Sequence, residues 1–363
     1  MSWPLRVGIV GGGFMARTHA HAARAAGAHV VALTSSSRES AERAARALGV
    51  PETAPDVVAL ARQVDVVHVC SPNAVHAAHA LAAIEAGAHV VCEKPLATSA
   101  GEAAVLVRAA DEAGVTATVP FVYRFHPMVR EARARVAAGA VGRLLTVRGT
   151  YLQDWMLDAG ADDWRVDPEA GGPSRAFADI GSHLVDLLEF VAGDQVVRLA
   201  ATIARAHPVR AGRPVLTEDA AAVVVETRGG AVGTLLVSQV SAGRKNALTV
   251  ELAGTAGAVQ VEQERPDELW LGRPEGATVL ARDPARLSPD AARLSTVPAG
   301  HPMGYLDAFE AFARDTYARV RGEEPDGLPR FADGLRAARL TDAVLRAAAS
   351  GTWVPVDHSE GAP

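Results

Sequence analysis

The sequence predicts an α/β protein in which a doubly wound parallel sheet is followed by a second, larger domain. A repeat is the first reason: Ala-rich helical segments close twice on AGAHVV, at 26–31 and 86–91, and each leads into a short apolar strand. Gly27 and Gly87 stand where a helix end favours a residue that tolerates positive φ. The second reason is a glycine-rich turn, GGGFMA at 11–16, directly after the first apolar run. These features are typical of a parallel sheet whose helices connect consecutive strands.

The remaining elements follow from hydrophobic periodicity. Strands of the first domain are expected at 5–11, 29–34, 64–70, 88–93 and 115–121, and helices at 14–26, 39–48, 74–86 and 99–113. Later strand-like runs have the spacing of a meandering sheet, at 144–152, 196–206, 220–227, 231–240, 247–253 and 257–262. Hairpin turns are expected at 228–232 and 253–259, and amphipathic helices at 301–320 and 334–351. We place the domain boundary so that the domains are 1–122 and 123–363.

Composition narrows the classes of partner. The 363 residues carry a formal charge of −6, and no basic run exceeds two residues. Nucleic acid and anionic membrane are therefore not expected as partners, whereas a phosphorylated small molecule is not excluded. Cys70 and Cys92 are too far apart for a CxxC motif and are expected to be core residues. The chain start lacks a secretory signal and no apolar run approaches a membrane span, so we expect a cytoplasmic protein.

The glycine turn predicts a dinucleotide site. It has the pattern Gly11-x-Gly13-x-x-Ala16 between a strand and a helix. Gly11 permits the tight turn, Gly13 lets a pyrophosphate approach the backbone, and the small Ala16 allows close helix–strand packing. The free N–H groups at the helix start then face the phosphates.

The end of the second strand bears on which cofactor binds. An acidic residue usually holds a free ribose 2′-hydroxyl there, but this chain reads Thr34-Ser35-Ser36-Ser37-Arg38. Hydroxyls and an arginine suit a 2′-phosphate better, which favours NADP over NAD. A serine-rich helix start, with Ser36 or Ser37 as N-cap, is the structural alternative, and both can hold together.

Three further motifs carry a resemblance to a known family. They are CSPNAVHAAHA (70–80), CEKPLA (92–97) and GGPSRAFADIGSHLVDLLEF (171–190). With the glycine turn, they make the chain similar to the Gfo/Idh/MocA oxidoreductases. The resemblance implies an N-terminal Rossmann domain and a C-terminal α+β domain with a large open, mostly antiparallel sheet. In the family this sheet commonly forms the oligomer interface, so a homodimer or homotetramer is expected. The missing acidic ribose ligand and Pro173 in the GGP run depart from the family pattern.

The resemblance also implies functional residues. Lys94 matches the active-site lysine, Asp179 and His183 match a D-x-x-x-H pair, and these three are the expected catalytic residues. Pro72 and Asn73 match the loop beside the nicotinamide. The full set of expected cofactor contacts is Gly11, Gly13, Phe14, Met15, Ala16, Ser35, Ser36, Arg38, Ser71, Pro72, Asn73, His76, Glu93, Lys94, Trp164 and Arg165.

The chemistry of these residues suits alcohol oxidation, in which a proton leaves oxygen while a hydride leaves carbon. If the segment after Ala178 is helical, Asp179 and His183 stand one turn apart, and the carboxylate can orient the imidazole as a base. Lys94, restrained by Pro95, would stabilise the developing alkoxide. Singly, each has a structural alternative: a solvated strand-end lysine, or an ordinary helix pair. A metal site is not expected, because no third ligand is convincingly placed.

Substrate contacts are expected from YLQDW at 151–155, which offers polar groups and a flat apolar face to a polyol. An aromatic-rich strand is as often plain core. The expected substrate residues are Lys94, Arg124, Tyr151, Gln153, Trp155, Asp179, His183 and His301. The resulting hypothesis is an NAD(P)-dependent dehydrogenase or reductase of a cyclic sugar, anhydrosugar or inositol. The alternatives are an NAD-dependent glycosidase that acts by transient oxidation and elimination, and a non-catalytic nucleotide-binding sensor.

Overall fold

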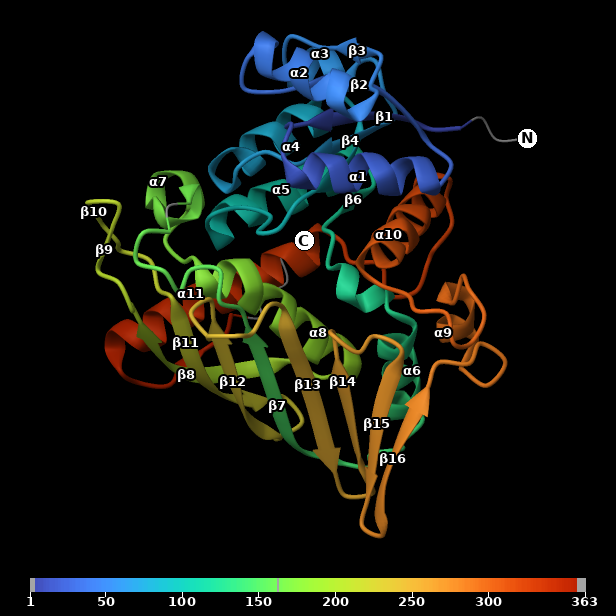
Figure 1. Ribbon diagram of the computed structural model, residues 1–363, viewed down its shortest axis with the longest axis vertical. Coiled ribbons are helices and arrows are strands. Elements are labelled where there is room, and N and C mark those ends of the chain that lie inside the picture. Colours follow the sequence, from blue (N-terminus) through green and yellow to red (C-terminus); the bar gives the residue numbers. More distant parts are fainter. Residues whose placement is uncertain (1–3, 162, 358–363) are drawn as a thin grey trace. The chain divides into compact units, whose positions relative to one another are not determined.

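The computed structural model describes residues 4–161 and 163–357 (Figure 1). The chain forms two compact units: Met1–Val122 with Tyr305–Ala338, and Tyr123–Gly304 with Arg339–Pro363. The first unit thus includes a late segment that the predicted division into 1–122 and 123–363 assigns to the second domain. Across the described residues, no helix combines the length and apolar character that crossing a membrane requires.

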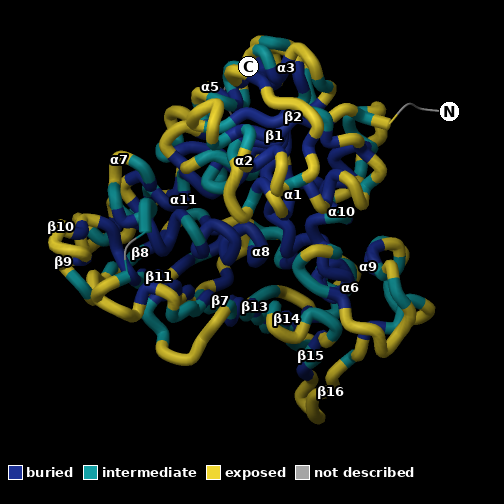
Figure 2. The backbone as a smooth tube through the Cα atoms, turned by 45° about the horizontal axis from the view of Figure 1, so that its top comes forward, coloured by how far each residue is buried: buried dark blue, intermediate teal, exposed yellow. Residues whose placement is uncertain are grey.

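The first unit is built on a six-stranded parallel sheet in the order β3-β2-β1-β4-β5-β6. Its strands are β1 (Arg6–Val10), β2 (His29–Thr34), β3 (Glu52–Thr53), β4 (Val66–Val69), β5 (His89–Cys92) and β6 (Ala117–Thr118). The order reverses beside β1, as in a doubly wound sheet, so the predicted architecture is confirmed. β1 is buried along its last four residues (Figure 2), as expected of a central parallel strand.

The helices of this unit are α1 (Phe14–Ala25), α2 (Arg38–Leu48), α3 (Val57–Ala61), α4 (His76–Glu85), α5 (Ala100–Ala113) and α10 (Tyr305–Val320). Local chemistry sets several ends. Ser37 and Ser99 accept backbone N–H bonds at the starts of α2 and α5, and Gly49 and Gly114 end those helices in left-handed conformations. α10 packs against α1. Helix α11 (Phe331–Ser350) begins in this unit and continues into residues of the second.

The second unit is built on a nine-stranded sheet in the order β16-β15-β14-β13-β7-β12-β11-β8-β17. Its strands are β7 (Leu144–Leu152), β8 (Val196–Ala204), β11 (Ala220–Thr227), β12 (Val232–Ser238), β13 (Ala247–Gly254), β14 (Ala258–Glu262), β15 (Glu268–Arg273), β16 (Gly276–Ala281) and β17 (Val354–Pro355). Neighbours are antiparallel except β12 and β7, which are parallel. The open, mostly antiparallel sheet and both predicted hairpins are confirmed. β9 (Val209–Arg210) and β10 (Arg213–Pro214) form a separate ribbon.

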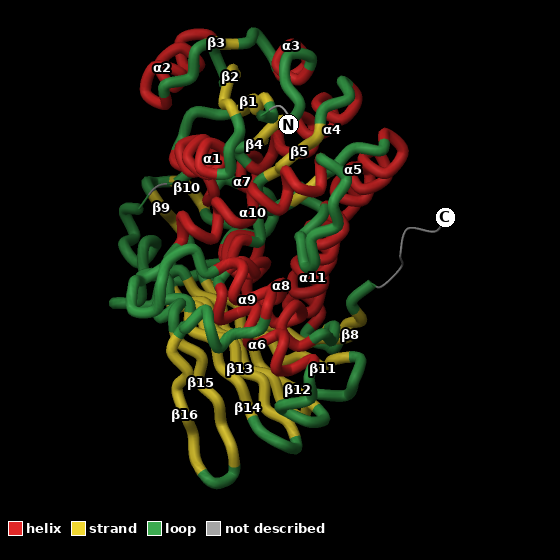
Figure 3. The backbone as a smooth tube through the Cα atoms, turned by 90° about the vertical axis from the view of Figure 1, so that its right-hand side faces the viewer, coloured by secondary structure: helices red, strands yellow, loops and turns green. Residues whose placement is uncertain are grey.

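Helices cover one face of this sheet. α6 (Pro127–Ala137) contacts β14 and β15, and α8 (Ser182–Ala192) contacts β7 and β13, so both lie along the same side (Figure 3). Two short helices, α7 (Pro168–Gly171) and α9 (Pro289–Leu294), belong to the loops. Side chains alternate along the strands, and Val224, Val232 and Leu236 remain exposed.

Candidate active site

The glycine turn of the first unit leaves space for a ligand. Gly11 has φ +117°, and a Cβ there would lie 2.6 Å from the carbonyl oxygen of Cys70, so only glycine fits. Gly13 caps α1, and nothing lies within 4 Å of the position its Cβ would take. Phe14 is exposed beside it, whereas Ala16 is fully buried against the sheet. The backbone N–H groups at the start of α1 are therefore accessible, as phosphate binding requires.

The serine-rich segment after β2 has one of the two features that the sequence suggested, the helix N-cap, and its contact with a 2′-phosphate stays a prediction. Ser37 is the N-cap of α2, as its hydroxyl accepts from the Ser40 N–H at 3.1 Å. Ser35 Oγ lies 3.0 Å from Ser40 Oγ. Arg38 is almost fully exposed and pairs with Glu42 of its own helix. Such an exposed pair contributes little and its arginine can exchange partners at small cost.

A buried histidine joins the loops that follow β4 and β5. His76 Nδ1 lies 2.8 Å from the carbonyl oxygen of Pro95, and its Nε2 lies 2.7 Å from that of Ser71. Burial lowers the pKa of His76, against the opposing effect of the two carbonyls. A neutral imidazole carries one N–H, so it donates to one of these two carbonyls at a time. Predicted as a cofactor contact, His76 thus has a clear local role: it ties together the two strand ends where the cofactor is expected.

Lys94 is the second residue after β5, at the carboxyl end of the parallel sheet, and the Lys94–Pro95 peptide is cis. Its backbone N–H donates to Glu93 Oε2 at 3.1 Å, and Glu93 Oε1 lies 2.9 Å from His19 Nε2. Burial acts to raise the pKa of Glu93, but the hydrogen bond from His19 and nearby positive charge, including that of Lys94, lower it below its ordinary value. The buried carboxylate is therefore ionised. Its expected contact with cofactor stays a prediction.

In the second unit, Asp179 and His183 lie on one continuous run of helical turns. The turn that bears Asp179 is a π-helix, Phe177–Gly181, and the α-helix begins only at Ser182. A regular helix was the expectation. Buried Glu218 accepts the N–H of Phe177 at 2.9 Å, and a Cβ on Gly181 would lie 2.7 Å from the Phe177 ring. These contacts fix a wider turn, a device frequent at functional sites.

Both residues of the pair contact polar neighbours from elsewhere in the unit. Asp179 Oδ2 accepts from Gln239 Nε2 at 2.8 Å, directly after β12. His183 is buried with its ring edge-on to that of Tyr123, at a centroid distance of 5.0 Å. The carboxylate and the imidazole are thus both held by side chains that the D-x-x-x-H motif does not contain.

A closed hydrogen-bonded ring, formed by Tyr123, Tyr151 and Asn246, continues the site. The two tyrosine hydroxyls are 2.7 Å apart, Tyr151 donates to Asn246 Oδ1 at 2.7 Å, and Asn246 Nδ2 donates to the Tyr123 hydroxyl at 3.2 Å. Gln153 Nε2 also donates to Asn246 Oδ1 at 2.8 Å, and Trp155 Nε1 donates to Gln153 Oε1. The predicted residues Tyr151, Gln153 and Trp155 therefore come together.

Sequence reasoning missed three members of this cluster. Tyr123 precedes Arg124 in FVYRFHP, but only Arg124 was predicted to contact the substrate. Asn246 and Gln239 follow no motif, and they reach the site because β13 and β12 flank β7 in the sheet. Only the strand order brings them together.

Arg124 is engaged inside the unit. Its Nε donates to Asp186 Oδ2 at 2.8 Å, Nη2 contacts Oδ1, and its guanidinium lies 4.8 Å from the Phe190 ring centre. Asp186 is 8 % exposed and is the buried partner of Arg124 rather than a charge on the helix surface. The substrate contact predicted for Arg124 is untested.

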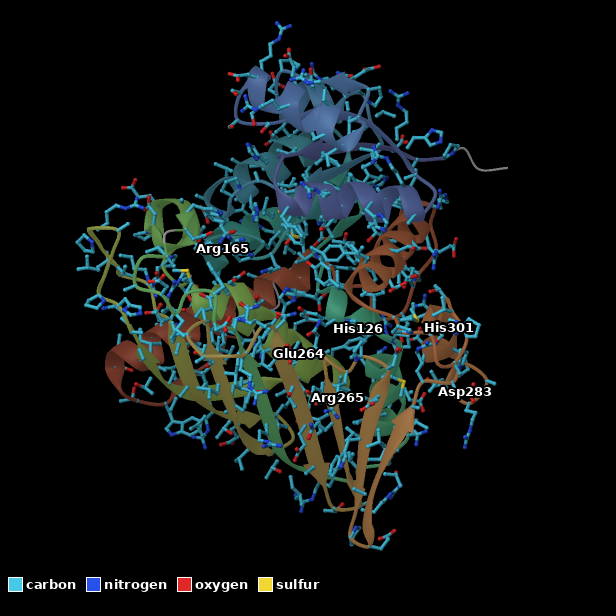
Figure 4. The ribbon with its side chains drawn as sticks, viewed as in Figure 1. His126, Arg165, Glu264, Arg265, Asp283 and His301 are labelled. Atoms are coloured by element: carbon cyan, nitrogen blue, oxygen red, sulfur yellow. The ribbon has the colours of Figure 1, made fainter. Side chains whose placement is uncertain are left out.

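The other predicted residues of this unit lie apart. Figure 4 places Arg165 near α7, on the side of the sheet formed by β8, and His301 on the opposite side, beyond β15. The Arg165 guanidinium lies 4.3 Å above the Trp164 ring and pairs with Asp163. His301 is exposed. Their cofactor and substrate contacts stay predictions. Within the described ranges, no group of three or more His, Cys, Asp or Glu side chains has the arrangement of a metal site.

Comparison with known proteins adds independent findings. A family model described as an oxidoreductase family with an NAD-binding Rossmann fold matches residues 5–121, and a GFO/IDH/MocA C-terminal domain matches residues 129–260. Levoglucosan dehydrogenase of Pseudarthrobacter phenanthrenivorans is 32% identical, over 97% of this chain and 98% of its own. The 1,5-anhydro-D-fructose reductase of Ensifer adhaerens is 30% identical over 97% and 98%. A solved levoglucosan dehydrogenase complex with NADH and levoglucosan has a TM-score of 0.91 at 31% identity, covering 98% of this chain and 100% of that one.

Proposed function

The chain belongs to the GFO/IDH/MocA oxidoreductase family, and we propose that it oxidises a secondary alcohol of a neutral cyclic sugar, anhydrosugar or inositol. It is an NAD(P)-dependent oxidoreductase acting on CH–OH groups. The observation that carries the choice of substrate class is the cluster around His183. There an imidazole lies against a ring of neutral hydroxyl and amide groups, and the Asp179 carboxylate accepts from the neutral amide of Gln239. Such groups donate to and accept from sugar hydroxyls without requiring charge.

Charge in the same unit supports a neutral substrate. Lys245, next to Asn246 in the chain, pairs with Asp154 at 2.7 Å, and Arg124 pairs with Asp186. The buried cation, Arg124, thus already has a carboxylate partner, whereas a phosphate site needs cations to spare. We therefore place phosphorylated sugars below their neutral counterparts as substrates.

The proposed chemistry assigns each catalytic group a task. His183 takes the proton from the substrate hydroxyl, and Asp179, which accepts from Gln239, orients the imidazole and stabilises its positive charge. The ammonium of Lys94 stabilises the developing alkoxide. The nicotinamide, bound at the glycine turn, supplies the hydride acceptor.

We propose NADP as the preferred cofactor. Ser35, Ser36 and Arg38 occupy the place of the usual acidic ribose ligand, and Arg38 can turn from Glu42 to a 2′-phosphate. The measurement is kcat/KM with NADP and with NAD for the protein and for Arg38→Ala. The expected result is a preference for NADP that falls about tenfold in the variant, close to the value of one charge-assisted contact. An equal preference in both proteins would contradict the assignment.

The substrate test is the absorbance of reduced nicotinamide on mixing the protein with each cofactor and a panel of levoglucosan, neutral sugars, inositols and sugar phosphates. Reduction by one neutral class, lost in His183→Ala, would support the proposal. Reduction by sugar phosphates alone would contradict it. Release of a free sugar from a glycoside without net cofactor reduction would indicate the glycosidase alternative.

Two predictions about the whole protein rest on the same reasoning. We propose a homodimer or homotetramer formed through the sheet of the second unit, where Val224, Val232 and Leu236 are exposed. Light scattering would test it, with Leu236→Glu expected to yield monomers. A cytoplasmic location is proposed from the sequence, and cell fractionation would test it.

A further inference from the structure

A row of four polar side chains crosses the interior of the first unit and ends at Glu93. Tyr317 Oη lies 3.0 Å from His68 Nε2, His68 Nδ1 lies 2.9 Å from His19 Nδ1, and His19 Nε2 lies 2.9 Å from Glu93 Oε1. None of the four is more than 4% exposed. Water therefore does not compete for these bonds, and each depends on its neighbours in the row. We call Tyr317, His68, His19 and Glu93 the relay.

The relay has a defined direction. Burial, with a further effect of His19, holds the pKa of His68 well below its usual range, so His68 carries one proton. Burial raises the pKa of Tyr317, which stays protonated, and within the described part of the chain its hydroxyl has His68 Nε2 as partner. Tyr317 therefore donates to His68, and the protons of His68 and His19 point onward to the Glu93 carboxylate. Every donor meets an acceptor.

The relay connects elements that are distant in sequence. His19 lies on α1, the helix that begins at the glycine turn, His68 lies on β4, and Tyr317 lies on α10. α10 packs on α1, and β4 pairs with β5, which ends just before Glu93. The late segment of the chain is thus bonded to the strand end that carries Lys94.

At its far end the relay fixes the backbone of Lys94. Glu93 Oε1 is occupied by His19, and Oε2 accepts the Lys94 N–H. On the other side of Lys94, His76 holds the carbonyl oxygen of Pro95. The Glu93–Lys94 peptide before the lysine and the Pro95–Leu96 peptide, one residue beyond it, are therefore both bonded to buried side chains.

Stability alone does not explain this arrangement. Burying an ionised carboxylate and two imidazoles carries a desolvation penalty, and apolar side chains of similar volume are often as stabilising or more so. Val67 and Val69 flank His68 on the same strand and are fully buried, so the strand accommodates apolar residues there. The chain instead directs three hydrogen bonds toward the residue before Lys94.

We propose that the relay positions Lys94 for reaction: Tyr317, His68 and His19 hold Glu93, and Glu93 holds the backbone of the lysine. The proposal rests on the catalytic role proposed for Lys94 above. The four relay residues act through Lys94 and are positioning residues. Loosening the relay should lower kcat more than it lowers cofactor affinity, because the glycine turn keeps its own contacts.

The chain offers a matched set of variants. Tyr317→Phe removes one hydroxyl at the start of the relay, and Glu93→Gln removes the charge at its end. Thr316→Val is the control: Thr316 neighbours Tyr317 on α10, is buried, and loses a hydrogen bond to Thr118 outside the relay. We expect kcat to fall about 3- to 10-fold in Tyr317→Phe and about 10- to 100-fold in Glu93→Gln, the range for residues that orient a reacting group. The control should change kcat less than about twofold.

A second measurement does not depend on turnover. The chain has two lysines, Lys94 and Lys245. Reductive methylation with a carbon-13 label therefore gives two lysine signals by nuclear magnetic resonance, and Lys245 serves as the internal reference. The Lys94 signal should shift in Tyr317→Phe and stay in place in Thr316→Val, whereas a purely structural role predicts similar small changes in both.

The outcomes separate the two proposals. If Lys94→Ala retains full activity, the catalytic role of Lys94 fails and the relay has nothing to position. If Lys94→Ala is inactive but Tyr317→Phe matches Thr316→Val in kcat and in the Lys94 signal, the relay proposal is overturned and the proposed function stands. Should Glu93→Gln not fold, the comparison of Tyr317→Phe with its control still decides.

Discussion

The two units hold their expected catalytic groups by different means. In the first, Lys94 follows an ionised and buried carboxylate, and three further buried side chains align on that carboxylate. In the second, His183 adjoins neutral hydroxyl and amide groups that bond to one another in a ring. Charge is thus used where a group must keep one position. Neutral groups are used where bonds must be exchanged for those of a substrate.

The largest effect on activity is expected from a substitution of Lys94 in the first unit. Lys94→Ala removes the ammonium that stabilises the alkoxide, and kcat should fall about 10³- to 10⁴-fold, as for other groups that stabilise transition-state charge. Steady-state kinetics with the identified substrate measures it. Lys245→Ala is the matched control, since Lys245 is exposed and pairs with Asp154, and its kcat should remain close to that of the unmodified protein. Equal losses in both variants would contradict the role of Lys94.

A buried ion cluster in the second unit sharpens the comparison. Asp219 is fully buried, contacts Arg175, and lies 2.8 Å from Arg210, beneath the segment that leads to Asp179. Asp219→Ala leaves two buried guanidinium groups without this partner, and the free energy of unfolding should fall by about 3–5 kcal/mol. Denaturant unfolding measures it. Arg198→Ala, which breaks the exposed pair with Glu226, should cost less than about 1 kcal/mol.

Substitutions in the ring of neutral groups should have smaller effects, and they should change substrate binding more than the catalytic rate. Tyr151→Phe deletes a hydroxyl from the ring, leaves Asn246 one donor short, and should raise the substrate KM about 3- to 10-fold with little change in kcat. A fall in kcat of more than a hundredfold, with KM unchanged, would instead make Tyr151 a catalytic group. Substrate titrations at saturating cofactor distinguish the two outcomes.

As pH falls, the first unit, which contains the relay, should lose stability before the second. The folded-state pKa values of His68 and Glu93 lie below their unfolded values, so the unfolded chain binds more protons at low pH. Their stabilisation is therefore present above those unfolded values and is lost as pH falls, for His68 from about pH 6.5. The slope should reach about 1.4 kcal/mol per pH unit for one such histidine.

Hydrogen exchange at pH 8 and pH 5, compared between β4 and β11, measures this effect. Protection of β4 should fall more than that of β11, and the difference should shrink in His68→Asn. Parallel losses in the two strands would show that the relay does not set the acid response.

Much of the fold was predictable because it depends on local periodicity. The strands β1, β2, β4 and β5 and the hairpin at 228–232 follow from apolar runs and glycine turns, whereas the short polar β3 does not. The β15–β16 hairpin was missed although Pro274 and Gly276 mark its turn, because β16 is largely exposed and has no apolar alternation. The helix α6, in PMVREARARVA, has too few apolar positions to show a stripe.

The site residues likewise fall into those that the sequence predicts and those that it does not. Lys94 and the Asp179–His183 pair stand in short motifs, so their order in the chain identifies them. The residues of the ring do not stand in a short motif, since Tyr123 bonds to Asn246, 123 positions away in the chain. The relay likewise joins Tyr317 to His68 across 249 positions. Such contacts are set by strand order and helix packing, which no local pattern encodes.

The most direct test of the account is a single turnover in the presence of one proposed substrate, with the absorbance of bound reduced nicotinamide followed in time. The proposed mechanism should yield one equivalent of reduced cofactor and one of ketone in the unmodified protein, and a rate at least about 10³-fold lower in Lys94→Ala. Substrate consumed with a free sugar released, and no net reduced cofactor, would contradict it.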